Sequence, residues 1–180
     1  MDQTARKIQQ NYKDKRILII ASGNDLDSRK LYDVSCYDKV CKVNKDYGHI
    51  TNRCDVIFTR WAQWLDHFFD PLMVQHADEV IIVNQFVGIT ATEIEFAKKI
   101  SGLEHVSAGF LAVLYFLLRG AKQVDLIGYG FLNGSFLKGG KKYCNKAFNY
   151  APGYLDNNKN YDFNKEHEIL QKLPGVNFVY

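Results

Sequence analysis

Short apolar runs constrain the fold of this chain more than any other feature of its sequence. The first, RILIIAS at residues 16–22, is apolar without alternation and ends at Gly23-Asn24. A run of this kind is typical of a strand buried on both faces of a parallel sheet. Similar runs lie at residues 38–44, 55–59, 79–84 and 124–128, and the last residues, 176–180, are a candidate for one more. We therefore expect a sheet of mainly parallel strands.

Helical patterns separate several of these strands. Thr90-Ala-Thr-Glu93 has the spacing of a capping box and opens one predicted helix, and two more are expected over residues 107–119 and 162–173. Strands that alternate with helices predict an α/β fold of the doubly wound, Rossmann-like type, with helices on both faces of the sheet. Because nothing marks a domain boundary, residues 1–180 are expected to form one domain, with residues 1–15 as a polar helix or tail.

The composition argues against several classes of protein. Lys and Arg number 23 against 20 Asp and Glu, and a net charge of +3 is too small to indicate nucleic-acid binding. The longest apolar run, residues 108–118, is well short of the roughly 20 residues that a membrane span needs. The first ten residues are polar, unlike a signal peptide, and the four cysteines lack zinc spacing. These features predict a cytoplasmic protein with free thiols and no stable membrane insertion.

Polar residues at the ends of the expected strands mark where a ligand would bind. In an open parallel sheet, ligands bind beyond the carboxyl ends of the strands. Three strands end at Asn24, Asn44 and Asn84, and a later one ends at Gly128-Tyr-Gly130. An amide both donates and accepts hydrogen bonds, which suits a sugar or a nucleobase edge. The alternative is that Asn and Gly at these positions only make turns.

The expected start of the second helix is another candidate site. Ser107 is a natural N-cap, and Gly109 would let an incoming group approach the free N–H donors of the first turn. Such a helix start favours phosphate. We expect a valine at position 109 to block that approach and to leave the fold intact. The alternative is a plain serine cap with a glycine for packing.

Familiar nucleotide and metal signatures are absent from the sequence. Gly23 lacks the companions of a GxGxxG, and no GxxxxGK[ST] occurs, which argues against a dinucleotide oxidoreductase and a P-loop phosphotransferase. The only Asp-x-Asp spacing, at Asp25-Leu-Asp27, follows Gly23-Asn24, where a turn is expected, and is interpreted as a turn or helix cap. We therefore expect no metal site and no cofactor.

Three stretches carry a family resemblance, and they occur in this order: Ile17–Asn44, Ser107-Ala-Gly109 with Val124–Phe131, and Tyr161–Glu166. Together they resemble the sialyltransferases of glycosyltransferase families 29 and 42, especially the short bacterial and phage-type members. The first is similar to a motif in which one strand ends in Gly-Asn and the next in Arg/Lys-x-Asn. The second resembles a Ser-Thr-Gly helix start with a Tyr-Gly-Phe strand end. The third resembles a motif of His, four residues and Glu.

The resemblance implies a single glycosyltransferase-like domain of a GT-A-like variant of the Rossmann-like fold. It implies a metal-independent, inverting transferase that moves a sialic acid-type sugar from a CMP-sugar donor to a glycan hydroxyl. Carried over residue by residue, it assigns substrate binding to Gly23, Asn24, Asn44, Ser107, Gly109, Gly128 and Glu166.

One position departs from the family pattern. Tyr161 stands where the resemblance places the histidine that acts as catalytic base. A phenol with a pKa near 10 is ionised in only about one molecule in a thousand at pH 7. His105, beside Ser107, is the alternative base. If neither residue acts, the alternative function is a catalytically impaired nucleotide-binding module of the same fold. A hydrolase or methyltransferase on a similar sheet is a further competitor, and it would carry an acidic residue in place of Asn44.

Overall fold

The computed structural model describes residues 9–21, 31–44, 51–59, 75–83, 91–129 and 162–179. The elements in these ranges are β1 (Arg16–Ile20), β2 (Lys39–Val43), β3 (Val56–Thr59), β4 (Glu79–Ile82), α3 (Ala91–Ser101), α4 (Ala108–Leu118), β5 (Gln123–Ile127), α5 (Phe163–Lys172) and β6 (Val176–Phe178). Each apolar run predicted from the sequence forms a strand, and each of the three helical patterns forms a helix.

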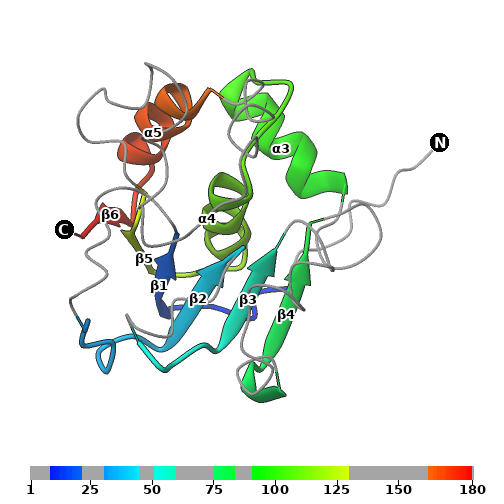
Figure 1. Ribbon diagram of the computed structural model, residues 1–180. Helices are drawn as coiled ribbons and strands as arrows, with labels where there is room; N and C mark the ends of the chain where they lie inside the picture. The colour runs from blue at the N-terminus through cyan, green and yellow to red at the C-terminus, as the bar shows by residue number, and fades with distance from the viewer. Residues whose placement is uncertain are drawn as a thin grey trace, which may run out of the picture.

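The sheet has the strand order β4-β3-β2-β1-β5-β6, and every neighbouring pair is parallel (Figure 1). The chain moves outward from β1 to β4 and then crosses back, so that β5 pairs with the opposite side of β1. This reversal makes the sheet doubly wound and places a topological switch point between β1 and β5. The structure therefore confirms the predicted α/β fold with a parallel sheet.

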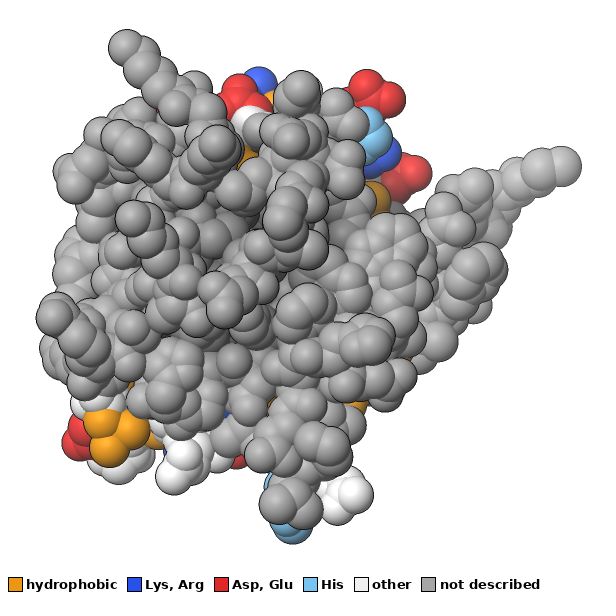
Figure 2. Space-filling view, in the orientation of Figure 1, with side chains coloured by type: hydrophobic (Ala, Val, Ile, Leu, Met, Phe, Trp, Pro, Cys, Tyr) orange, Lys and Arg blue, Asp and Glu red, His pale blue; other side chains and the backbone are white. Residues whose placement is uncertain are grey.

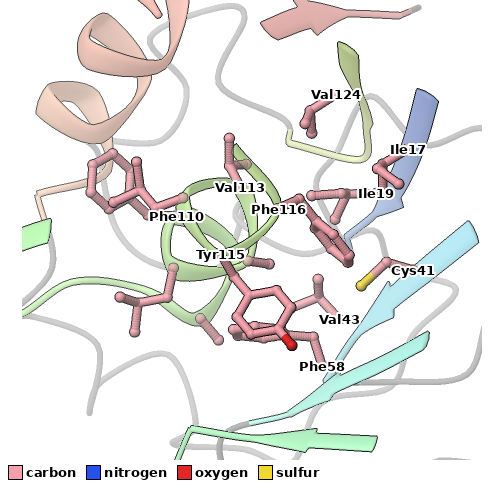
Figure 3. Close-up of a cluster of buried hydrophobic side chains, with 14 of the residues drawn as sticks. Ile17, Ile19, Cys41, Val43, Phe58, Phe110, Val113, Tyr115, Phe116 and Val124 are labelled. Carbon is pink, nitrogen blue, oxygen red and sulfur yellow. The ribbon is translucent and has the colours of Figure 1, made fainter. Parts of the chain in front are cut away.

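The main core lies between the sheet and α4, which Figure 1 shows over the strands with α3 and α5 to either side. Tyr115 and Phe116 of α4 are buried on the side that faces the strands, whereas Phe110 is buried on the side that faces away from them (Figure 3). The rings of Tyr115 and Phe58 meet edge to face, with centroids 6.0 Å apart. Ala97 of α3 and Leu170 of α5 also belong to this core. The apolar run predicted over residues 108–118 is thus buried by packing on the sheet.

The opposite face of the sheet carries a smaller apolar cluster. It consists of Leu18, Ile20, Val34, Val40 and Ile127. Within the described part of the chain, residues 31–37 pack on this face, with Tyr32 and Tyr37 against the cluster. Burial on both faces explains why the strands are apolar without alternation.

The segment that precedes β1 is partly built into the core. Tyr12 is buried, and its ring packs edge to face on Phe116 with centroids 4.8 Å apart. The hydroxyls of Tyr12 and Tyr115 both donate to the carboxylate of Glu79 at the start of β4. The sequence predicted a polar helix or tail over residues 1–15; in its described part, residues 11–14 form a turn. Tyr12 was missed because a single aromatic residue in a polar stretch gives no periodic signal.

Glu93, in the first turn of α3, forms a buried ion pair. Its carboxylate accepts from the guanidinium of Arg119 at the end of α4. The guanidinium also lies 3.6 Å from the ring centroid of Tyr115. Thr90, the other half of the predicted capping box, lies outside the described residues. Glu93 therefore links α3 to α4 in addition to any local role at the helix start.

The described helices present charged side chains outward. Lys98 and Lys99 of α3 and Lys165 and Glu168 of α5 are exposed. Charged side chains show at the upper rim of the space-filling view, where Figure 1 places these helices (Figure 2). In the ranges that the structure describes, no helix has the length and apolar character needed to cross a lipid bilayer.

Candidate functional site

The candidate site lies at the carboxyl edge of the sheet, where β1 and β5 end side by side. Ile20 pairs with Ile127, and the N–H of Ala21 donates to the carbonyl of Ile127 over 2.9 Å. Gly128 follows with φ +75°, and a Cβ there would lie 1.9 Å from the carbonyl oxygen of Ala21. Only glycine permits this close approach of the two strands. Gly128 therefore shapes the switch point through its backbone.

Helix α4 begins at the same edge. It ends just before β1 starts, where the N–H groups of Tyr12 and Asp14 donate to the carbonyls of Arg119 and Gly120, respectively. Its first turn lies beside Tyr129, which follows β5 and donates from its hydroxyl to the carbonyl of Gly109 over 3.1 Å. The helix consequently runs antiparallel to the strands, and its N-terminus faces the switch-point edge.

Ser107 is the N-cap of α4, as the sequence predicted. It has an extended backbone, with φ −72° and ψ 158°, and its Oγ accepts from the N–H of Phe110 over 3.1 Å. The N–H groups of Ala108 and Gly109 have no hydrogen-bond partner among the described residues. They are the donors of the first turn that a ligand could use.

Gly109 packs closely against Tyr129. A Cβ at position 109 would lie 3.3 Å from Cε1 of the Tyr129 ring, and that ring is buried. The methyl groups of a valine at this position would press on this ring, so whether the fold stays intact depends on whether the ring can shift by a few tenths of an ångström. The contact supports the alternative of a glycine needed for packing.

Glu166 joins the start of α5 to the start of α4. Its carboxylate is buried, with 1% of the residue exposed. Oε1 accepts from the N–H of Ser107 over 2.7 Å, and Oε2 accepts from the Ser107 hydroxyl over 2.6 Å. Both lengths are short, as expected for hydrogen bonds to a charged acceptor. The Ser107 hydroxyl thus donates its hydrogen to Glu166. These two predicted site residues therefore contact each other.

Asn44 lies at the same edge, directly after β2. It has φ +62°, and its N–H donates to the carbonyl of Phe58 over 2.9 Å. Asparagine tolerates this left-handed conformation better than most residues do. Asn44 is partly exposed. Its position next to the end of β1 is consistent with the strand-end prediction.

Lys42, two residues before Asn44, is a feature that the sequence analysis left out of the candidate site. Its side chain is fully buried at 0% exposure, and its Nζ donates to the carbonyl of Thr51 over 2.9 Å. A buried ammonium is rare in proteins and needs hydrogen-bond acceptors around it. The available signal was the Arg/Lys-x-Asn pattern itself, which Lys42-Val43-Asn44 matches.

Tyr129 is a second residue that sequence reasoning did not assign to the site. Burial raises the pKa of its phenol well above the ordinary value, and the nearby Cys41 and Glu166 act in the same direction. The phenol therefore stays neutral and acts as a hydrogen-bond donor to Gly109. Its ring also meets Phe178 of β6 edge to face, with centroids 6.5 Å apart. Tyr129 thus ties the end of β5 to α4 and β6.

The remaining candidates divide into an exposed residue and several outside the described ranges. His105 lies exposed in the connection between α3 and α4, two residues before the N-cap. Gly23 and Asn24 lie outside the described residues, shortly after Ala21. Tyr161 also lies outside them, directly before Asp162, whose side chain caps α5 by accepting from the N–H of Lys165. The described candidates from the three motif stretches therefore meet at one edge of the sheet.

Comparison with known proteins finds similarity of structure only. No protein-family model matches this chain, and no curated protein sequence matches it. A mammalian sialyltransferase crystal structure aligns with a TM-score of 0.60 and 14% identity, over 92% of this chain and 69% of that one. A mammalian sialyltransferase in complex with Gal-beta-1-3GalNAc-ortho-nitrophenol aligns with a TM-score of 0.56 and 14% identity, over 93% and 69% of the two chains. These alignments show that the chain has a sialyltransferase-like fold.

Proposed function

We propose that this chain is a metal-independent, inverting glycosyltransferase that transfers a sialic acid-type sugar from a CMP-sugar donor to a glycan hydroxyl. The observation that carries the proposal is the meeting of the three motif stretches at one switch-point edge. The likeness to a sialyltransferase over 92% of the chain supports it, because ligands of doubly wound folds bind at such a point.

The donor half of the site lies, in this proposal, between the ends of β1 and β5 and the start of α4. Gly23, Asn24 and Asn44 contact the nucleotide, and the N–H groups of Ala108 and Gly109 face its phosphate. Their support is the position of Asn44 at this edge and the two N–H groups that lack partners among the described residues. Ser107, Gly128 and Glu166 contribute by shaping the site, which their contacts with each other and with Ala21 support.

The proposed reaction is a single displacement. The acceptor hydroxyl oxygen forms a bond to the anomeric carbon of the donor sugar, on the face opposite the phosphate. The bond from that carbon to the phosphate oxygen breaks, and CMP leaves with the electron pair. A base, Tyr161 or His105, takes the hydroxyl proton. Backbone N–H donors stabilise the charge that develops on the leaving phosphate. We therefore expect transfer to continue in the presence of EDTA.

The acceptor is proposed to be a glycan. Its support is that one structural neighbour was solved in complex with Gal-beta-1-3GalNAc-ortho-nitrophenol, a disaccharide derivative. We also propose a cytoplasmic location. The free thiol of Cys36, which is exposed, supports it, because exposed thiols persist in a reducing compartment.

CMP is expected to bind and to stabilise the protein. At a concentration near 100 times the dissociation constant, linkage gives about 2.7 kcal/mol. For a domain of this size, the melting temperature should rise by about 5–10 °C. Asn44→Gly should reduce the shift, because glycine keeps the left-handed backbone at this position and removes only the amide. Thermal unfolding with CMP, UMP, GMP and AMP measures all of these effects.

Equal shifts with all four nucleotides would rule out the cytidine assignment, and no shift with any of them would overturn the proposed function. Asn52→Gly is a matched control, because Asn52 is exposed and lies outside the proposed site. This variant should retain the full CMP shift.

Activity toward a CMP-sugar is expected to depend on pH through the base. If Tyr161 acts, the rate should rise about tenfold per pH unit from pH 7 toward the phenol pKa, since only the ionised form accepts the proton. Tyr161→His should then raise the rate at pH 7, where an imidazole is mostly in its basic form. Initial rates of transfer and of donor hydrolysis between pH 6 and 10 measure this.

Other outcomes assign the base differently. If Tyr161→His changes little and His105→Ala removes activity, His105 is the base. If the wild type neither transfers nor hydrolyses the sugar, yet binds CMP, the chain is a nucleotide-binding module of the same fold.

A further inference from the structure

We propose that Glu166 is a positioning residue for the donor site. Through its contact with Ser107, it holds the first turn of α4 in the orientation that receives the donor phosphate. The proposal rests on the proposed function. It differs from the role that the family resemblance implied, in which Glu166 contacts the substrate itself.

The geometry of the contact supports an indirect role. Both carboxylate oxygens are used by Ser107, at 2.7 Å and 2.6 Å, and the residue is 1% exposed. The carboxylate is therefore engaged by Ser107 inside the protein rather than presented to solvent. Ser107 instead transmits its effect, because the same hydroxyl that donates to Glu166 accepts from the N–H of Phe110. The carboxylate and the helix cap therefore form one continuous hydrogen-bonded unit.

This unit determines where the free donors point. Two hydrogen bonds from Glu166 constrain both the backbone and the side chain of Ser107, whose extended conformation directs the chain into α4. Ala108 and Gly109 follow immediately, and their N–H directions depend on that conformation. Glu166 comes from α5, 59 positions later in the chain. The start of α4 is thus oriented by a group outside its own local sequence.

Stability alone is a weak reason for such a contact. Burying a carboxylate carries a large desolvation penalty, and hydrophobic residues of similar volume often serve stability equally well. A carboxylate that accepts two hydrogen bonds fixes the orientation of its partner, because hydrogen bonds weaken steeply when misaligned. A small misplacement of groups that position a substrate strongly reduces function. We therefore assign Glu166 a role in orienting the first turn of α4, rather than in stabilising the fold.

The test measures CMP affinity by isothermal titration at a temperature where circular dichroism shows every variant folded. We expect Glu166→Gln to bind CMP about tenfold more weakly than wild type, a difference of about 1.4 kcal/mol. Glutamine keeps the shape but loses the charge and one of the two acceptors. Ser107→Ala should weaken binding similarly, and the double variant should be no worse than the weaker single one, because both changes break one contact. Ser107→Thr keeps the hydroxyl and should retain most of the affinity.

Glu168→Gln is the matched control, since Glu168 is an exposed glutamate on the same helix. It should bind CMP as wild type does. If Glu166→Gln does not fold, Ser107→Ala provides the same measurement with the carboxylate in place. Wild-type CMP binding with unchanged affinity in folded Glu166→Gln and Ser107→Ala would overturn the positioning role and leave the proposed function standing. Absence of CMP binding by the wild type would overturn both.

Discussion

Replacing Gly128 with alanine is expected to destabilise the protein by about 5 kcal/mol, at the upper end of what single substitutions do. Two costs combine. Position 128 has φ +75°, and the left-handed conformation costs a non-glycine residue about 1–2 kcal/mol. The new Cβ would also lie 1.9 Å from the carbonyl oxygen of Ala21, so β1 and β5 would have to separate. Urea denaturation gives the change in free energy, and the melting temperature should fall by about 10–20 °C.

Gly102→Ala separates the two costs. Gly102 has a similar φ of +64°, but a Cβ there would lie 3.4 Å from Nζ of Lys165, the end of a flexible side chain. This variant should show only the conformational cost, about 1–2 kcal/mol. Equal losses for the two variants would mean that the approach of β1 to β5 is not tight, and the switch point would need a different description.

Alkaline pH is expected to unfold the protein steeply. Burial, together with hydrogen bonds to Glu79, raises the pKa of Tyr12 and Tyr115, and burial raises that of Tyr129. In the unfolded chain these phenols lose their protons near pH 10, whereas in the folded chain they keep them. The stabilising contribution is therefore complete below pH 10 and is lost as the pH rises above it. Each such tyrosine lowers the unfolding free energy by about 1.4 kcal/mol per pH unit, so the three together lower it by about 4 kcal/mol per pH unit.

Urea denaturation at intervals between pH 9 and 11, with tyrosine ionisation followed by ultraviolet absorbance, measures this slope. Tyr12→Phe removes one titrating group and should reduce the slope by about 1.4 kcal/mol per pH unit. An unfolding free energy that stays constant through pH 11 would show that these phenols ionise without cost in the folded state, contrary to their burial.

Local patterns in the sequence were sufficient to predict the elements of the fold. Each buried strand was visible as a run of apolar residues, because both faces of a parallel sheet are covered and no alternation is needed. The cap of α4 was visible because Ser107 bonds to an N–H group only three residues away. Apolar runs and cap bonds of this kind involve only residues close together in the sequence, so a short stretch of chain is enough to reveal them.

Part of the candidate site was also predicted from local patterns. Asn44, Ser107 and Gly128 were found at strand ends and at a helix start, and a parallel sheet brings such positions to one edge. The resemblance to sialyltransferases added Glu166 but implied a contact with substrate. It did not reveal that the partner is Ser107, because a motif records which residues occur and not which atoms meet.

The sequence by itself determined the strands, the helices, the cap of α4 and the edge of the sheet at which polar residues gather. Only the tertiary structure decided that Glu166 bonds to Ser107, that Glu93 bonds to Arg119 and that Gly128 packs on Ala21. The physical reason is the distance along the chain over which each kind of interaction acts. Propensity and periodicity act between neighbours within a turn or a strand, whereas these contacts depend on the strand order and on how the helices pack across it.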